Sequence, residues 1–230
     1  ARLTHSGSYI HVGPEIGVAS TKAFTGQVTM LTMMAIIVGY ERGFLPKSEY
    51  QKLVQELARI PQKVEELLKN CQKQVEYIAG EFKNAPNALY LGRGYNFPVA
   101  LEGALKLKEI SYIHAEGYAS GELKHGPIAL IDRMVPVVVL APRDALFDKT
   151  VSNMQEVMAR HGKVLLITDS KGENEAGDGT WKVLTMPTVP PLLAPILYAV
   201  PAQLLAYHTA CAKGTDVDQP RNLAKSVTVE

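Results

Sequence analysis

Hydrophobic positions in the last two thirds of the chain form short runs that alternate with longer stretches of helical character. Four short runs are predicted strands: residues 88–91, 135–140, 163–168 and 181–186. Three longer stretches are predicted helices: residues 98–110, 151–160 and 192–213. The run 135–140 contains no charged residue, which is typical of a strand covered on both faces. The alternation predicts an α/β fold in which helices lie on both sides of a parallel sheet.

The first eighty residues follow a different pattern. Only residues 9–12 have the pattern of a strand, and they are followed by a predicted helix at 20–40. A charged, amphipathic helical stretch then covers 48–82, and Pro61 is expected to break or kink it. One strand and two helices cannot form a covered parallel sheet. We therefore expect residues 1–80 to be the end of a preceding α/β domain whose beginning is absent, so that the chain is a fragment.

Composition narrows the class of protein. The 230 residues are 47% hydrophobic and 20% charged, with a net charge of +1. A nucleic-acid-binding protein would normally carry a strong basic excess. Two distant cysteines indicate neither a disulfide framework nor a metal cluster.

No membrane segment or leader is expected. The run 30–40 is too short to span a bilayer, and 192–211 is interrupted by Pro195, Pro201 and Gln203, which favours a buried helix. The start of the chain lacks the apolar run of a signal peptide. These features predict a cytoplasmic protein that does not enter a membrane.

The first candidate for chemistry is the segment 13–24, which follows the predicted strand at 9–12 and opens a helix. Gly13 and Gly17 allow unusual backbone angles, and Ser20 and Thr21 present hydroxyls and amides that an anion could accept. Open α/β sheets bind ligands at such places. The alternative is a capped helix start with no further role.

The second candidate is a charged stripe on the predicted helix 98–110. Glu102, Lys106 and Glu109 are spaced i, i+4 and i+7 and therefore share one face. A lysine beside a glutamate could poise that carboxylate to move a proton on and off carbon. The alternative is a solvated, salt-bridged helix face.

Two further candidates lie later in the chain. His125 stands in a glycine-rich segment, 116–127, between Lys124 and Gly126-Pro127, and it is either a catalytic group or a turn histidine bonded to backbone. Lys225 near the end is either functional or a solubilising charge. The other histidines lack metal-ligand spacing, and 92–94 is too short for a dinucleotide fingerprint, so neither a metal nor any other cofactor is expected.

Four segments together resemble one enzyme family. They read GPEIGVASTKAF at 13–24, ALEGALKLKEISYIHAE at 100–116, GELKHGP at 121–127 and DQPRNLAKSVTVE at 218–230. The sequence is similar along nearly all its length to the C-terminal isomerase half of the glutamine–fructose-6-phosphate aminotransferases, also called glucosamine-6-phosphate synthases. That half consists of two sugar-isomerase (SIS) domains. The resemblance implies a three-layer αβα fold with a parallel sheet: a first-domain remnant at 1–80, a second SIS domain at 81–213, and a tail at 214–230 that folds over the active site.

The resemblance also implies roles for individual residues. Members of the family take ammonia from glutamine in an N-terminal domain and convert fructose 6-phosphate to glucosamine 6-phosphate, a step of amino-sugar biosynthesis. Glu109 would shuttle the proton between C1 and C2, and Lys106 would assist it. His125 would open the sugar ring in a neighbouring subunit of a homodimer. Lys225 would engage the sugar carbonyl, which for a Schiff base needs a partly unprotonated lysine.

Other positions of the family pattern are implied to line the sugar site: Val18, Ser20 and Ala224. The glutaminase domain and the phosphate-holding loop of the first SIS domain are absent from these 230 residues, so the chain alone is expected to be inactive. Two alternatives remain. One is a stand-alone SIS sugar-phosphate isomerase or fructosamine-phosphate deglycase. The other is a non-catalytic module that senses sugar phosphates, which would be expected to lack the acid/base residues.

Overall fold

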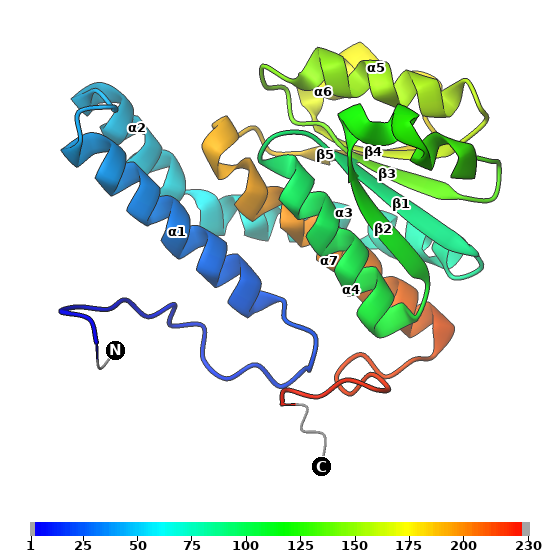
Figure 1. Ribbon diagram of the computed structural model, residues 1–230, viewed down its shortest axis with the longest axis horizontal. Helices are drawn as coiled ribbons and strands as arrows, with labels where there is room; N and C mark the ends of the chain where they lie inside the picture. The colour runs from blue at the N-terminus through cyan, green and yellow to red at the C-terminus, as the bar shows by residue number, and fades with distance from the viewer. Residues whose placement is uncertain (1–2, 227–230) are drawn as a thin grey trace.

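Five parallel strands form the centre of the molecule (Figure 1). The computed structural model describes residues 3–226, so residues 227–230 of the predicted tail and residues 1–2 lie outside the described part. The strands are β1 (Asn87–Gly92), β2 (His114–Ala119), β3 (Pro136–Leu140), β4 (Lys163–Asp169) and β5 (Lys182–Met186). Their order in the sheet is β2-β1-β3-β4-β5. The chain therefore reverses its direction of winding between β1 and β3, and parallel neighbours require crossover helices.

Helices cover both faces of the sheet, as the strand–helix alternation predicts. Helices α4 (Asn96–Ser111), α7 (Ala194–Lys213) and α3 (Ile60–Phe82) pack on one face, where Tyr90 and Val138 are buried. Helix α5 (Phe147–Met158) covers the other face, with the seven-residue α6 (Ser170–Ala176) beside it. Alternate residues of β1 and β3 point to opposite faces, which produces two apolar cores separated by the sheet.

Close contact between α4 and the elements beneath it depends on a glycine. A Cβ at Gly103 would lie 2.7 Å from Cε1 of Tyr90 and 3.0 Å from the Cβ of Ala202 on α7. Real Cβ atoms do not approach other atoms so closely, so only glycine fits at this position without a shift. The close spacing of α4 and α7, which both contribute residues to the candidate site, therefore depends on Gly103.

The N-terminal region is helical but contains no strand. Helices α1 (Lys22–Glu41) and α2 (Lys47–Ala58) precede α3, and the break between α2 and α3 falls at Arg59, with Pro61 in the first turn of α3. The strand predicted at residues 9–12 is wrong: these residues have no regular secondary structure. Within residues 3–226 no strand pairs with them, and an isolated extended segment leaves its backbone donors and acceptors without a ladder.

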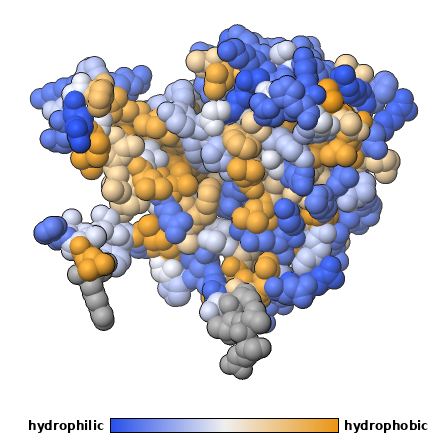
Figure 2. Space-filling model, in the orientation of Figure 1, coloured by the Kyte–Doolittle hydropathy of each residue, from blue (hydrophilic) through white to orange (hydrophobic). Residues whose placement is uncertain are grey.

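Two helical segments are long and apolar enough to cross a membrane by length and composition: Lys22–Glu41 and Pro191–Lys213. The second is 61% buried and forms part of the core, which accounts for its apolar character. The first is only 6% buried, and Figure 2 shows hydrophobic side chains over it. The apolar residues of α1 that are at least half exposed are Leu31 (63%), Met34 (51%), Ile37 (50%) and Val38 (54%).

Candidate functional site

The last three turns of α4 hold a buried ion cluster. The Nζ of Lys106 lies 2.5 Å from Oε2 of Glu109 and 4.0 Å from Oε1 of Glu102. The side chains of Lys106 and Glu102 are 3% and 6% exposed, and that of Glu109 is 21% exposed. A solvated salt-bridged face is therefore excluded. Removing these charges from water costs free energy, and the attraction between Lys106 and the two carboxylates offsets part of that cost.

Glu102 is the most buried carboxylate of the cluster, and the sequence places it on this helix face without giving it a role of its own. Burial raises its pKa to about 7, although the charge of Lys106 and a hydrogen bond from Gln203 oppose the rise. Nε2 of Gln203, on α7, lies 3.4 Å from Oε1 of Glu102. A carboxyl with a pKa near neutrality can both hold and release a proton at physiological pH.

The loop before α1 reaches this cluster through Glu15. Its Oε1 accepts hydrogen bonds from the backbone N–H groups of Thr21 (2.8 Å) and Lys22 (2.9 Å) and from the hydroxyl of Thr21 (3.0 Å). Glu15 thus caps α1 from six residues upstream of Thr21, where an anion is favoured by the helix dipole. Burial raises the pKa of Glu15, but the hydrogen bonds from Thr21 and neighbouring groups outweigh it, and the pKa is lowered overall.

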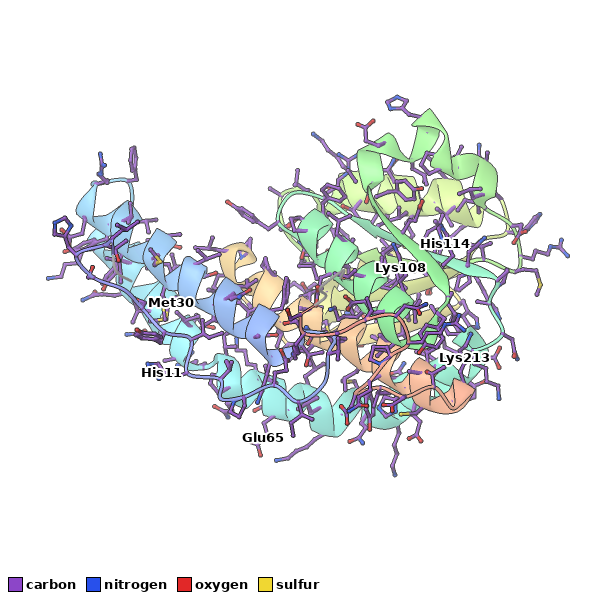
Figure 3. The ribbon with its side chains drawn as sticks, turned by 60° about the horizontal axis from the view of Figure 1, so that its bottom comes forward. His11, Met30, Glu65, Lys108, His114 and Lys213 are labelled. Carbon is purple, nitrogen blue, oxygen red and sulfur yellow. The ribbon has the colours of Figure 1, made fainter. Side chains whose placement is uncertain are left out.

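The C-terminal tail lies against both the loop and the end of α4, as Figures 1 and 3 show. The backbone N–H of Val18 donates to the carbonyl of Asp218 at 2.8 Å. The hydroxyl of Thr215 donates to the carbonyl of Ile110 at 2.6 Å. In Figure 3 the tail leaves the end of α7, near the labelled Lys213, and passes toward the start of α1.

These elements enclose a cavity of about 250 Å³. The lining residues come from the loop, α4, α7 and the tail: Glu15, Gly17, Ala19, Thr21, Lys106, Ile110, Gln203, Tyr207, Val217 and Asp218. At its rim, Nζ of Lys225 lies 3.8 Å from Oε2 of Glu15. The cavity therefore combines the buried Lys106 with the side chains of Glu15 and Asp218, and Lys225 of the tail lies beside Glu15.

Of the predicted site residues, Lys106 lines the cavity, Glu109 is paired with Lys106, and Lys225 lies beside Glu15. Val18 and Ser20 lie in the loop, and Ala224 is exposed beside Lys225 in the tail. Residues 214–226 of the tail carry the contacts to the loop and to α4 described above. Glu15 and Gln203 were missed by the sequence reasoning. A glutamate six residues before a helix start is the signal that could have revealed Glu15.

His125 is placed elsewhere within this chain. It lies on the 3₁₀ helix Ser120–His125, which follows the carboxyl end of β2, whereas Glu109 precedes the amino end of that strand. The six residues of β2 span about 17 Å. His125 is exposed, and its Nδ1 lies 2.7 Å from Oε2 of Glu122.

The cluster on α4 is suited to proton transfer to and from carbon. Glu109 is partly exposed and paired with Lys106, and Glu102 lies on the same helix face 4.0 Å from that lysine. A cation beside the reacting atoms also stabilises the negative charge that develops on an oxygen in such a step. Within residues 3–226, no group of three His, Cys, Asp or Glu side chains is arranged to hold a metal ion.

Comparison with known proteins gives the family. The model of the SIS domain matches residues 81–213, which is more than half of the chain. The chain belongs to the SIS domain family. A solved structure described as the C-terminal domain of glucosamine-fructose-6-phosphate aminotransferase from Francisella tularensis superposes with a TM-score of 0.86 at 46% identity. It covers 90% of this chain and 58% of that one.

Curated relatives show higher identity. The chain is 60% identical over 220 residues to the glutamine–fructose-6-phosphate aminotransferase (isomerizing) of Zymomonas mobilis, and 61% identical over 218 residues to that of Bradyrhizobium diazoefficiens. These matches cover 95–96% of this chain and 36% of the length of each relative. A tagatose-6-phosphate ketose/aldose isomerase of Escherichia coli shares the fold, with a TM-score of 0.64 at 20% identity over 90% of this chain and 55% of that one.

Proposed function

We propose that the chain is the isomerase part of a glutamine–fructose-6-phosphate aminotransferase. In this proposal the full-length protein combines fructose 6-phosphate with ammonia from glutamine and releases glucosamine 6-phosphate, as an enzyme of the cytoplasm. The observation that carries the proposal is the carboxylate of Glu109 paired with Lys106, a lysine that lines the cavity, in a chain 60% identical to an enzyme of that name.

The roles of the residues follow from the reaction. An imine at C2 becomes an amino aldose when a proton is removed from C1 and one is delivered to C2. The hydroxyl proton on O1 also leaves as the aldehyde forms, and the imine nitrogen gains a proton to become the amine. Glu109 performs both transfers at carbon, and Lys106 holds its carboxylate in place and stabilises charge on the neighbouring oxygen. Lys225 contacts the sugar carbonyl, and Val18, Ser20 and Ala224 line the sugar. His125 opens the sugar ring from the neighbouring subunit of a homodimer, which is compatible with its distance from Glu109 along β2.

The rest of the enzyme lies outside these residues in our proposal. Residues 1–80 are the end of a first SIS domain with linker helices, 81–213 are the second SIS domain, and 214–230 are the tail that closes the active site. Since the relatives are covered to only 36% of their length, we assign glutamine hydrolysis and phosphate binding to segments not among these 230 residues. The exposed apolar face of α1 is then covered by the remainder of the first SIS domain. The chain alone is expected to form no glucosamine 6-phosphate from glutamine.

The test uses Glu109→Gln in the full-length gene product. We expect formation of glucosamine 6-phosphate to fall by about 10²-fold or more, since positioned acid/base groups contribute about 10²–10⁴-fold. Glutamine hydrolysis, measured as glutamate release, should remain. Glu65→Gln is the matched control, because Glu65 is an exposed glutamate on α3. Product formation by Glu109→Gln at the wild-type rate would contradict the assignment of the base.

The alternatives predict different results from the same protein. A stand-alone isomerase or a deglycase would turn over a sugar phosphate or fructosamine phosphate with no dependence on glutamine. A non-catalytic sensor would bind sugar phosphates and turn over neither. Either result with the wild-type protein would contradict the proposal and favour the corresponding alternative.

A further inference from the structure

The two carboxylate oxygens of Glu15 face different parts of the molecule. Oε1 accepts all three hydrogen bonds from Thr21 and Lys22 at the start of α1. Oε2 is directed to the tail, where it lies 3.8 Å from Nζ of Lys225. The Glu15 side chain is 12% exposed and that of Lys225 is 50% exposed. The carboxylate is therefore fixed by the loop, while the lysine is the member of the pair that is free to move.

A capping role alone does not explain this arrangement. Capping uses one oxygen, and Thr21 itself, at the N-cap position, makes no side-chain hydrogen bond to the helix start. The tail meets the same loop at a second place, where the N–H of Val18 donates to Asp218, and a Cβ at Gly17 would lie 3.2 Å from Oδ1 of Asp218. The loop and the tail thus contact each other at Glu15, Gly17 and Val18. Glu15 is the charged end of that contact.

We propose that Glu15 is a positioning residue that holds Lys225, and with it the C-terminal tail, over the cavity. One oxygen of Glu15 is anchored by the start of α1, and the other orients the lysine ammonium at the rim. The proposal depends on the proposed function only for the role of Lys225 toward a sugar carbonyl. The tail contact itself does not depend on that role.

The position of Glu15 suits this task better than that of the other carboxylates. Glu102 and Glu109 both share Lys106, so neither is available to a second cation without competition. Glu15 contacts no other lysine or arginine side chain among residues 3–226. A lysine orientated by a fixed carboxylate loses less conformational freedom when it engages a substrate, because that freedom is already restricted.

The first experiment measures hydrogen exchange of backbone amides in the full-length gene product. Glu15→Gln retains an oxygen that can accept the capping bonds but removes the charge that attracts Lys225. We expect exchange at residues 216–225 to rise about two- to fivefold, the effect of a partly exposed ion pair. Exchange at residues 22–25 should stay at the wild-type rate. Glu15→Ala should accelerate exchange at both places, and Glu65→Gln at neither.

A double-mutant cycle with Lys225→Met separates positioning from a general loss of structure. If Glu15 acts through Lys225, Glu15→Gln has no additional effect on tail exchange in the Lys225→Met background. An unchanged tail in Glu15→Gln, or an effect of equal size in both backgrounds, would overturn the proposal.

The second experiment measures steady-state kinetics with fructose 6-phosphate. We expect Glu15→Gln to lower kcat by about two- to fivefold, in proportion to the lost positioning of the tail, with a smaller change in glutamine hydrolysis. An unchanged kcat alongside accelerated tail exchange would overturn the link to Lys225 chemistry. If the wild-type protein turns over no sugar phosphate, the proposed function fails, while the exchange experiment still decides the role of Glu15 in the tail.

Discussion

Nζ of Lys106 lies 4.0 Å from Oε1 of Glu102, one helical turn earlier on α4, and both side chains are almost fully buried. Replacing Lys106 by Met therefore leaves two carboxylates without a partner in a poorly hydrated place. We expect the free energy of unfolding at pH 7.5 to fall by about 3 kcal/mol, the usual cost of breaking a buried pair. Urea unfolding followed by circular dichroism measures it.

The matched control is Lys108→Met, since Lys108 is exposed on the same helix (Figure 3). It should change stability by less than about 0.5 kcal/mol. The loss in Lys106→Met should also be smaller at pH 5.5, where Glu102 takes up a proton and no longer needs a partner. Equal losses at both pH values would mean that charge is not the cause.

Glu102 makes stability depend on pH in a defined direction. Its pKa is about 7 in the folded chain, against a usual value of 4.5. The folded state therefore binds this proton more tightly than the unfolded state. The resulting contribution of Glu102 to the free energy of unfolding is complete below about pH 4.5 and is lost as the pH rises through 7. The difference corresponds to about 3 kcal/mol. Glu102→Gln should flatten the pH dependence of unfolding between pH 4.5 and 8, and a slope equal to wild type would contradict the shift.

Two helical glycines are expected to respond in opposite ways to alanine. At Gly103 the new Cβ would meet Tyr90 and Ala202, so Gly103→Ala should destabilise the fold by about 1–3 kcal/mol. At Gly80, on α3, nothing lies within 4 Å of the new Cβ. Gly80→Ala should stabilise it by about 0.5 kcal/mol through helix propensity. Thermal unfolding of both variants measures the two changes in stability. If both substitutions stabilised the fold, α4 would tolerate a wider spacing from β1 and α7.

Tyr112 anchors the tail at the end of α4. Its hydroxyl accepts a hydrogen bond from the backbone N–H of Arg221 at 2.9 Å, and the guanidinium of Arg221 lies 4.2 Å from the ring centroid. Tyr112→Phe retains the ring and removes only the acceptor. We expect faster hydrogen exchange at the Arg221 amide with global stability within about 0.5 kcal/mol of wild type. Wild-type exchange at that amide would show that the ring contact alone holds the tail.

The sheet could be predicted where its strands are buried on both faces. Residues 135–140 and 163–168 consist mostly of apolar, β-branched or aliphatic residues, and β3 and β4 lie there. β2 was missed because it is an edge strand with His114, Glu116 and Gly117 in its six residues. Gly117 is required there by packing, since a Cβ would lie 2.8 Å from the backbone of Leu101. A contact between distant segments of this kind leaves no local pattern in the sequence.

The site could be predicted only in part for the same reason. The spacing of Lys106 and Glu109 places them on one face, and the structure pairs them. Whether that face is solvated depends on α7 and the loop before α1, which are distant in sequence. Gln203, for example, reaches Glu102 from 101 residues away.

The contact between Val18 and Asp218 joins residues from opposite ends of the chain. During synthesis the loop that contains Val18 leaves the ribosome long before its partner is made. The sheet and its covering helices can form in that interval, because their contacts are completed by α7. The cavity can therefore close only after Asp218 has been synthesised, and a nascent chain arrested short of Asp218 would carry the fold of the domain without a finished site.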